Sequence, residues 1–193
     1  MIYSSSKGLS TKSLIITAMF TAIICVLSQI IIPIQPIPFS LSLLAIFLTG
    51  ALLEPRYAFL STLAYLLLGA FGLPVFAGFK GGINILTGMT GGFLMAYPLM
   101  AFITSLSYQI SLKLKSTSSW NKLNHKTLPA LGMVISLFIC YLIGSLWFSY
   151  VADTTISYAL TVCVIPFIAF DLLKIFMALS AAMAIKRVLG QVI

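Results

Sequence analysis

Six long apolar segments, separated by short polar stretches, constrain the fold of this chain. They cover residues 13–32, 41–53, 57–73, 91–112, 128–150 and 157–185. A helix of about 20 apolar residues crosses a bilayer. Only 7% of the residues are charged, whereas soluble domains carry about 25%. This excludes an ordinary soluble enzyme. We therefore expect an all-α integral membrane protein, with six transmembrane helices in a single membrane domain over residues 1–193.

The positions of lysine and arginine predict the orientation in the membrane. Every cation except Lys80 and Lys174 lies before the first segment, after the second, after the fourth or after the sixth. With six spans these positions share one side of the membrane, and cytoplasmic loops carry the excess of Lys and Arg. Both termini are therefore expected in the cytoplasm. The net charge of +8 then reflects topology and not nucleic-acid binding.

Two loops on the opposite side have unusual compositions. Pro33, Pro36 and Pro38 predict extended backbone in the first loop, because proline fixes φ and lacks an N–H. Residues 74–92 hold six of the thirteen glycines and yet are rather apolar. We expect this region to fold back over the protein near membrane depth, where non-helical backbone needs protein cover. A plain connector is the alternative. Asn84 is its main polar side chain, as a ligand group or a turn former.

An acid and a lysine lie within the sixth apolar segment. Asp171 falls near its middle and Lys174 follows three residues later, so the two side chains share a helix face. Each charge would cost roughly 2.5–3.5 kcal/mol if isolated at the bilayer centre, and such charges indicate a functional site. A structural ion pair, or Lys174 reaching toward the cytoplasm, is the alternative. Pro166, just before them, predicts a kink.

Other candidate residues are less specific. Tyr97 either lines a cavity or lies at a membrane interface. Ala18 and Ala22 form a small-x-x-x-small pair that lets helices approach closely, within this protein or against a partner.

The three cysteines lack C-x-x-C spacing, and the lone histidine, His125, lies among lysines, so we expect no metal site. The sequence has no P-loop motif for ATP, and we expect no resident cofactor.

Five stretches together carry a family resemblance. They read P-I-P-F-S-L at 36–41, L-T-G-A-L-L-E-P-R at 48–56, Y-L-L-L-G-A-F-G-L-P-V-F-A-G at 65–78, G-M-T-G-G-F-L-M-A-Y-P at 88–98 and F-D-L-L-K at 170–174. Over nearly its whole length the chain resembles BioY, the biotin-specific substrate-binding (S) component of energy-coupling-factor (ECF) transporters. The resemblance implies the six-helix S-component fold. It also implies biotin uptake by a multi-pass protein of the bacterial inner membrane.

The resemblance implies a substrate site near the outer side, covered by the loops after the first and third segments. Asp171 and Lys174 match the family's acid-x-x-lysine pair and would contact biotin. Asn84 lies in the matching glycine-rich loop. Phe39 and Tyr97 complete the substrate-binding residues that we expect. Lys174 and Lys80 are the two candidates for contact with the biotin carboxylate.

Partners also follow from the resemblance. Ala18 and Ala22 match the alanine motif with which S components dock onto the transmembrane coupling protein. Two cytoplasmic ATPases of the ABC class would drive transport, so that ATP is used by partner subunits.

The chain departs from the family pattern at three positions. Ser40 and Ser42 stand where the first loop commonly has threonine and glutamine, and Met89 replaces a proline. These departures bear on the detail of the loops and on affinity, whereas the pair Asp171 and Lys174 is intact, so biotin is kept as the expected ligand. Two alternatives are an S component for another vitamin, and an intramembrane enzyme that uses Asp171 as acid or base. No second catalytic group accompanies Asp171 in the sequence, so we expect binding without a catalytic step.

Overall fold

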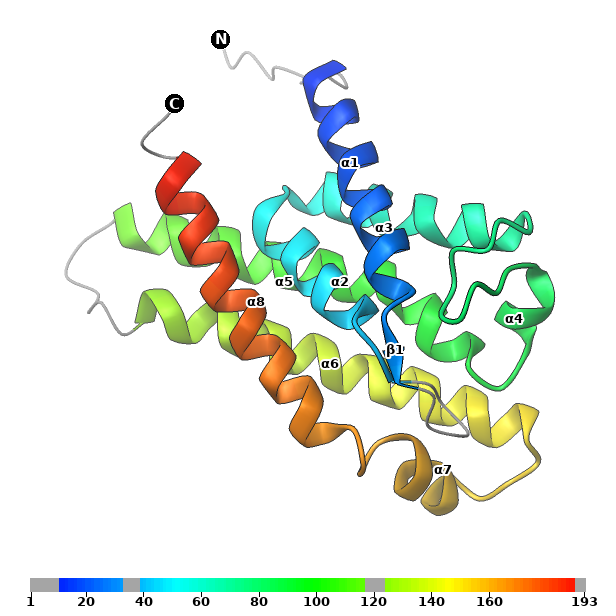
Figure 1. Cartoon of the computed structure of the whole chain (residues 1–193). Helices are drawn as coiled ribbons and strands as arrows, with labels where there is room; N and C mark the ends of the chain where they lie inside the picture. The colour runs from blue at the N-terminus through cyan, green and yellow to red at the C-terminus, as the bar shows by residue number, and fades with distance from the viewer. Residues whose placement is uncertain (1–10, 33–38, 117–123, 190–193) are drawn as a thin grey trace, which may run out of the picture.

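The computed structural model describes residues 11–32, 39–116 and 124–189. Its elements in chain order are α1 (Thr11–Ser28), β1 (Ile31–Ile32), β2 (Phe39–Ser40), α2 (Ser42–Leu52), α3 (Pro55–Ala70), α4 (Ile83–Thr87), α5 (Gly91–Ser116), α6 (Asn124–Val151), α7 (Ile156–Cys163) and α8 (Ile168–Leu189). The mainly helical architecture expected from the sequence is confirmed (Figure 1). The proline-rich stretch 33–38, for which extended backbone was expected, lies outside the described residues.

Four helices of the described part are long and apolar enough to cross a membrane: α1, α5, α6 and α8. The second apolar segment forms α2, a shorter apolar helix of 11 residues. The third forms α3, which has 16 residues and begins with Pro55 at a position where proline is well tolerated. At 1.5 Å per residue, α2 spans only about half of a hydrocarbon core of roughly 30 Å.

The first and sixth apolar segments are not single helices. Helix α1 ends at Ser28, and residues 31–32 pair with residues 39–40 in a short antiparallel ladder, with Ile31 opposite Ser40. The sixth segment is divided between α7 and α8 by turns at residues 164–167. Pro166 lies in these turns and lacks the N–H that a continuous helix needs. The expected kink is therefore a complete break.

Helix α5 occupies the centre of the bundle. It packs along α6 and also contacts α2 and α3, while α8 packs on α2 and α1 packs on α3 and α2. Gly50 of α2 allows one of these close approaches, because a Cβ there would lie 2.7 Å from Cβ of Thr104 on α5. Small residues permit this packing in lipid, where the hydrophobic effect does not drive helices together.

Buried hydroxyl groups connect several helices. Thr21 of α1 bonds to the backbone oxygen and hydroxyl of Ser61 on α3, at 3.1 and 3.2 Å. Thr104 of α5 lies 3.2 Å from the hydroxyl of Ser136 on α6. Such pairs contribute a modest stabilisation, about 0.6 kcal/mol each on average in membrane proteins. They keep polar side chains inside the bundle and away from lipid.

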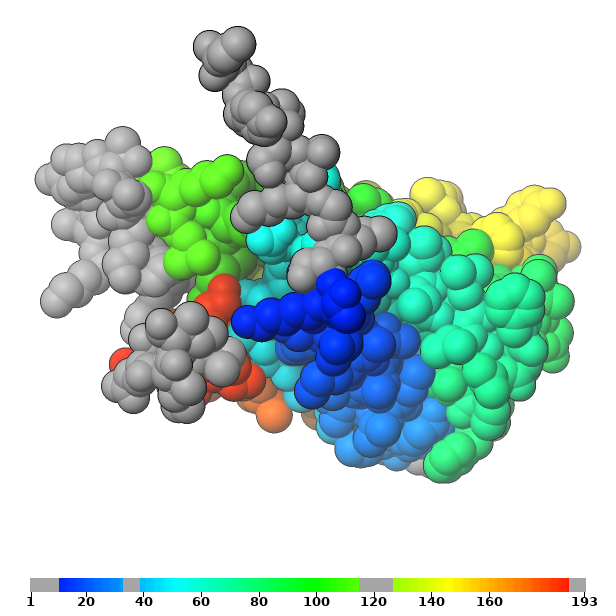
Figure 2. Space-filling model, turned by 90° about the horizontal axis from the view of Figure 1, so that it is seen from above, coloured from blue at the N-terminus to red at the C-terminus, as the bar shows by residue number. Residues whose placement is uncertain are grey.

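The ends of the helices segregate along the molecule. In Figure 1 the start of α1 lies at the top, the end of α8 at the upper left, and the end of α5 and the start of α6 at the left, whereas α4 lies at the right and α7 at the lower right. The start of α1 carries Lys12, the last turn of α5 carries Lys113, and the last turn of α8 carries Lys186 and Arg187. Figure 2 shows α1 in blue at the surface beside the blue-green α3.

Candidate functional site

The break before α8 positions the acid expected at the site. Asp171 was placed near the middle of one continuous span, but it lies in the first turn of α8. The correction has a physical reason, since Pro166 ends the preceding helical run and α8 begins anew at Ile168. The N-terminal end of a helix carries partial positive charge, which favours a carboxylate. The first turn of α8 is therefore a better environment for Asp171 than a helix centre.

Asp171 and Lys174 form the ion pair that their spacing predicts. Nζ of Lys174 donates to Oδ1 of Asp171 across 2.8 Å. Both residues are almost fully buried, with 2% and 3% of their surface exposed, so Lys174 does not reach out to the membrane surface. The shared face is confirmed. Their role in ligand binding stays a prediction.

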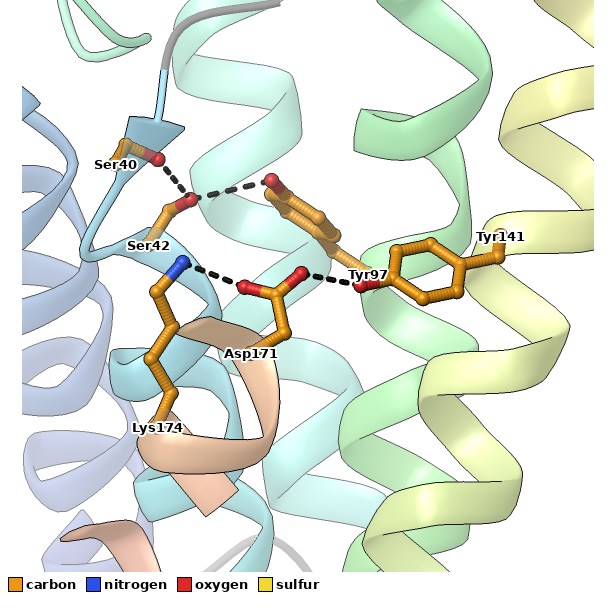
Figure 3. A network of polar contacts seen from close by, with 6 residues as sticks. All are labelled: Ser40, Ser42, Tyr97, Tyr141, Asp171 and Lys174. Carbon is orange, nitrogen blue, oxygen red and sulfur yellow. Dashed lines mark hydrogen bonds and ion pairs between the residues drawn. The ribbon is translucent and has the colours of Figure 1, made fainter. Parts of the chain in front are cut away.

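Two further side chains complete the environment of the pair. Tyr141 of α6 donates its hydroxyl proton to Oδ2 of Asp171 across 2.6 Å. Phe39 of β2 places its ring centroid 3.9 Å from Nζ of Lys174, a cation–π contact. Figure 3 shows the chain from Lys174 through Asp171 to Tyr141. Each charge thus has a second partner from another element.

Tyr141 was not identified from the sequence. A signal for it did exist, because a buried carboxylate has two oxygens and one lysine leaves one of them in need of a donor. A tyrosine within a neighbouring apolar segment is a suitable donor. The sequence does not, however, say which helix faces α8, and that packing decides between the tyrosines.

A second polar chain lies next to the ion pair. The hydroxyl of Ser42 lies 2.6 Å from that of Ser40 and 3.1 Å from that of Tyr97. Figure 3 shows this chain running beside the one that contains Asp171. Ser40 and Ser42 are two of the departures from the family pattern, and here they form a connected unit. Tyr97 is buried, so it lines the interior of the protein.

Two adjoining cavities connect these groups. The larger cavity, of about 250 Å³, is lined by Phe76, Lys80, Asn84 and Met89 of the 74–92 region and by Tyr65 of α3. The smaller cavity, of about 60 Å³, contains Asp171, Lys174, Tyr141 and Phe39 in its wall. Both include Ser40, Ser42, Phe93 and Tyr97. The expected site residues Phe39, Asn84, Tyr97, Asp171 and Lys174 therefore line one continuous region.

The 74–92 region folds back against the helices, as expected. Phe76 is inserted among them with 1% of its surface exposed, and its ring meets that of Tyr65 edge-on at 5.5 Å. At the far end of the region, the indole N–H of Trp147 donates to the backbone oxygen of Gly88 across 2.9 Å. Asn84 lies between these anchors, in the short helix α4. The region's depth in the membrane stays a prediction.

Ala18 and Ala22 lie apart from these cavities. Both are exposed on α1, so they do not serve internal packing. They line an apolar groove between α1 and α3, together with Cys25, Leu67 and Phe71. Docking of a partner there stays a prediction.

No group of three or more His, Cys, Asp or Glu side chains that could hold a metal ion occurs within residues 11–32, 39–116 and 124–189.

Comparisons with known proteins agree on one family. Residues 4–191 match the sequence model of the BioY family. The biotin transporter BioY of Thermotoga maritima is 37% identical over 176 residues, which cover 91% of this chain and 96% of that protein. The probable biotin transporter BioY of Pyrococcus horikoshii is 34% identical, with 94% and 99% covered.

A solved structure has the same overall fold. The S-component for biotin from an ECF-type ABC transporter superimposes with a TM-score of 0.78 and 28% sequence identity. The superposition covers 93% of this chain and 95% of that one.

Proposed function

This chain belongs to the BioY family, and we propose that it binds biotin between its helices as the S component of an ECF-type ABC transporter in the bacterial cell membrane. The observation that carries the proposal is the buried cluster of Asp171, Lys174 and Tyr141, which forms part of a cavity wall. Charged side chains at membrane depth typically mark a substrate pathway or binding site.

The chemistry of the cavity walls suits biotin. Its planar ureido group has two N–H donors and one carbonyl, and its thioether ring is apolar. Asp171 accepts a hydrogen bond from a ureido N–H, and Lys174 or Asn84 donates to the carbonyl. Phe39 and Phe93 provide apolar wall for the ring. Leaving a buried amide unpaired costs roughly 1–3 kcal/mol, so this pairing discriminates against ligands that lack it.

Two cations are placed to meet the carboxylate of biotin. Lys174 lies beside the smaller cavity and already pairs with Asp171, whereas Lys80 lines the larger cavity and is exposed. Comparing biotin with its uncharged amide in Lys80→Gln and wild-type protein separates the two. If Lys80 binds the carboxylate, the substitution weakens binding of the acid and leaves that of the amide unchanged.

The site supports binding without a catalytic step. Both carboxylate oxygens of Asp171 accept hydrogen bonds from Lys174 and Tyr141, and this arrangement favours a fixed acceptor over a proton-transferring acid or base. We propose no resident cofactor. In the proposed complex, ATP is hydrolysed by the partner ATPases.

The proposed topology has six spans and cytoplasmic termini. The four long apolar helices, the shorter α2 and the 16-residue α3 supply six membrane segments. The helix ends that carry Lys12, Lys113, Lys186 and Arg187 lie away from α4 and α7 in Figure 1, which supports a cytoplasmic position for these ends. The larger cavity then opens toward the outside, where biotin arrives.

The proposed partners are the transmembrane coupling protein and two ABC-class ATPases. The exposed pair Ala18 and Ala22, in its apolar groove on α1, supports docking of an apolar helix there. Small residues in such a groove allow a close helix–helix contact within lipid.

Binding of tritiated biotin to the detergent-purified chain tests the proposal. We expect saturable binding that excess thiamine or riboflavin does not displace, and recovery of chemically unchanged biotin after long incubation. The variant with both Asp171→Ala and Lys174→Ala is expected to lose binding. Absence of saturable binding to the wild type, or its survival in the double variant, refutes the assignment. Displacement by thiamine or riboflavin indicates another vitamin, and altered ligand indicates an enzyme.

A further inference from the structure

One side chain at the end of α1 bonds to two points of the loop above the larger cavity. Gln29, which directly follows α1, donates from Nε2 to the backbone oxygen of Val75 across 2.8 Å. A longer contact of 3.4 Å joins the same nitrogen to the oxygen of Pro74. Oε1 of Gln29 accepts from the backbone N–H of Phe79 across 2.8 Å. We call residues 74–80 the cap segment.

The cap segment forms part of the cavity wall. Its backbone closes on itself, with Phe76 and Lys80 bonded in both directions at 2.9 and 3.2 Å. Phe76, Ala77 and Lys80 line the larger cavity. The position of this closed turn therefore decides whether the cavity is covered on that side.

Gln29 bonds to a part of the cap segment that has little other support. Phe79 has a φ of 56°, a left-handed conformation that residues other than glycine rarely adopt. Its side chain is 71% exposed, so packing contributes little to holding it. The backbone N–H of Phe79 instead bonds to Gln29. Without that acceptor, the N–H must bond to water and the left-handed turn loses its support.

We propose that Gln29 is a positioning residue that holds the cap segment closed over the ligand cavity and thereby sets the rate of ligand release. The identity of the ligand in this proposal rests on the proposed function. Two net hydrogen bonds correspond to roughly a ten- to hundredfold change in the equilibrium between a closed and an open cap. Cap opening controls release when a ligand leaves only through the open form.

Gln29→Met tests the proposal, because methionine keeps the length of the side chain and removes its hydrogen bonds to the cap segment. The variant also removes the bond of 3.2 Å from Nε2 to the backbone oxygen of Cys25 within α1. Gln109→Met is the matched control, since Gln109 is half-buried on α5. It lies about 27 Å along the helix from Gly91, where α5 begins next to the larger cavity's loop. Two quantities are measured in detergent: the dissociation rate of tritiated biotin, and the amide hydrogen exchange of residues 74–80 in ligand-free protein.

In Gln29→Met we expect biotin dissociation to be roughly ten- to hundredfold faster, with no decrease in association rate, and faster exchange confined to residues 74–80. Gln109→Met should match the wild type in both. If Gln29 only supports folding, the variant contains less binding-competent protein, but that fraction releases biotin at the wild-type rate. This result would overturn the proposal. Faster exchange without faster dissociation overturns it as well.

The two measurements also separate this proposal from the proposed function. If wild-type protein does not bind biotin, the assignment of the ligand fails, whereas the exchange of ligand-free protein still reports on the cap. In that case, unchanged exchange in Gln29→Met overturns the role of Gln29, and faster exchange confined to residues 74–80 supports it.

Discussion

Tyr141 donates its hydroxyl proton to Oδ2 of Asp171 across 2.6 Å, and this bond joins α6 to the first turn of α8. The other carboxylate oxygen is held by Lys174, so the carboxylate is oriented before a ligand enters. Each carboxylate oxygen can accept more than one hydrogen bond. An N–H of the ligand can therefore be added without breaking the existing contacts.

Removing the hydroxyl of Tyr141 tests this orienting role. Tyr141→Phe leaves one oxygen of a buried carboxylate without its donor, and hydrogen bonds to charged groups contribute about 1.5–3 kcal/mol. We expect roughly a tenfold or larger loss of biotin affinity and a lower unfolding midpoint. Isothermal titration calorimetry and thermal unfolding in detergent measure the two effects.

Tyr158→Phe is the control for this change, because Tyr158 is 53% exposed on α7. It should alter neither affinity nor stability. Equal affinities of Tyr141→Phe and the wild type would contradict an orienting role for the Tyr141 hydroxyl.

The ion pair should affect stability and binding differently. Removing one partner of a buried pair leaves an uncompensated charge and costs about 3–5 kcal/mol, whereas replacing both partners by apolar groups is often close to neutral. We therefore expect Lys174→Met to destabilise the protein strongly. Adding Asp171→Leu should restore much of the stability without restoring biotin binding. Thermal unfolding and calorimetry on the same samples measure both quantities.

If the double variant binds biotin, the pair is a structural ion pair and not part of the ligand site. If it is no more stable than Lys174→Met, the cost does not arise from an unpaired charge. The two readouts therefore distinguish the functional interpretation of the pair from the structural one.

The ring of Phe39 is expected to contribute through Lys174. It lies 3.9 Å from Nζ of Lys174 and 5.1 Å from the ring of Phe170. Phe39→Leu removes the π-face, and a cation–π contact is worth about 0.5–2 kcal/mol, so biotin affinity should fall several-fold. Phe39→Tyr keeps the ring and should bind nearly as well. If calorimetry gives equal losses of biotin affinity in the two variants, the loss does not arise from removal of the aromatic ring.

Local spacing predicted part of this site from the sequence. The ion pair follows from a separation of three residues on a helix, and the cover over the cavity follows from a glycine-rich but apolar loop. Pro166 indicated a disturbance in the last apolar segment, but not that the helix would break and restart. A single proline is compatible with a kink or a break, and the surrounding packing decides between them.

The rest of the site depends on which helices face one another. The bond from Tyr141 to Asp171 joins α6 to α8, and the bond from Ser42 to Tyr97 joins α2 to α5. The two bonds from Gln29 reach about 50 residues along the chain. The sequence shows the periodicity of each helix, but it does not show which face of one helix packs against the next. Residues that act through such contacts therefore need the structure.

The groove on α1 gives a prediction about partner docking that is separate from the ligand site. Tryptophan at Ala18 and Ala22 fills the space in which another helix would lie, so Ala18→Trp with Ala22→Trp should abolish co-purification with the coupling module. Biotin binding by the isolated chain should be unchanged, because neither alanine lines the ligand cavities. Ile23→Trp is the control, since Ile23 is exposed on α1 but does not line the groove. Unimpaired assembly of the double variant would contradict docking at this groove.

Close packing between Gly69 and Phe76 should anchor the wall of the larger cavity. A Cβ at Gly69 would overlap the Phe76 ring, which is buried against Tyr65. Overpacking of this kind costs about 1–3 kcal/mol, so Gly69→Ala should lower the unfolding midpoint and weaken biotin binding by displacing Phe76. Adding Phe76→Leu removes the overlap and should recover stability, whereas biotin binding should recover less because the aromatic wall is lost. Thermal unfolding and calorimetry of the three variants provide the measurement. If Phe76→Leu restores no stability to Gly69→Ala, the effect of the alanine does not arise from contact with this ring.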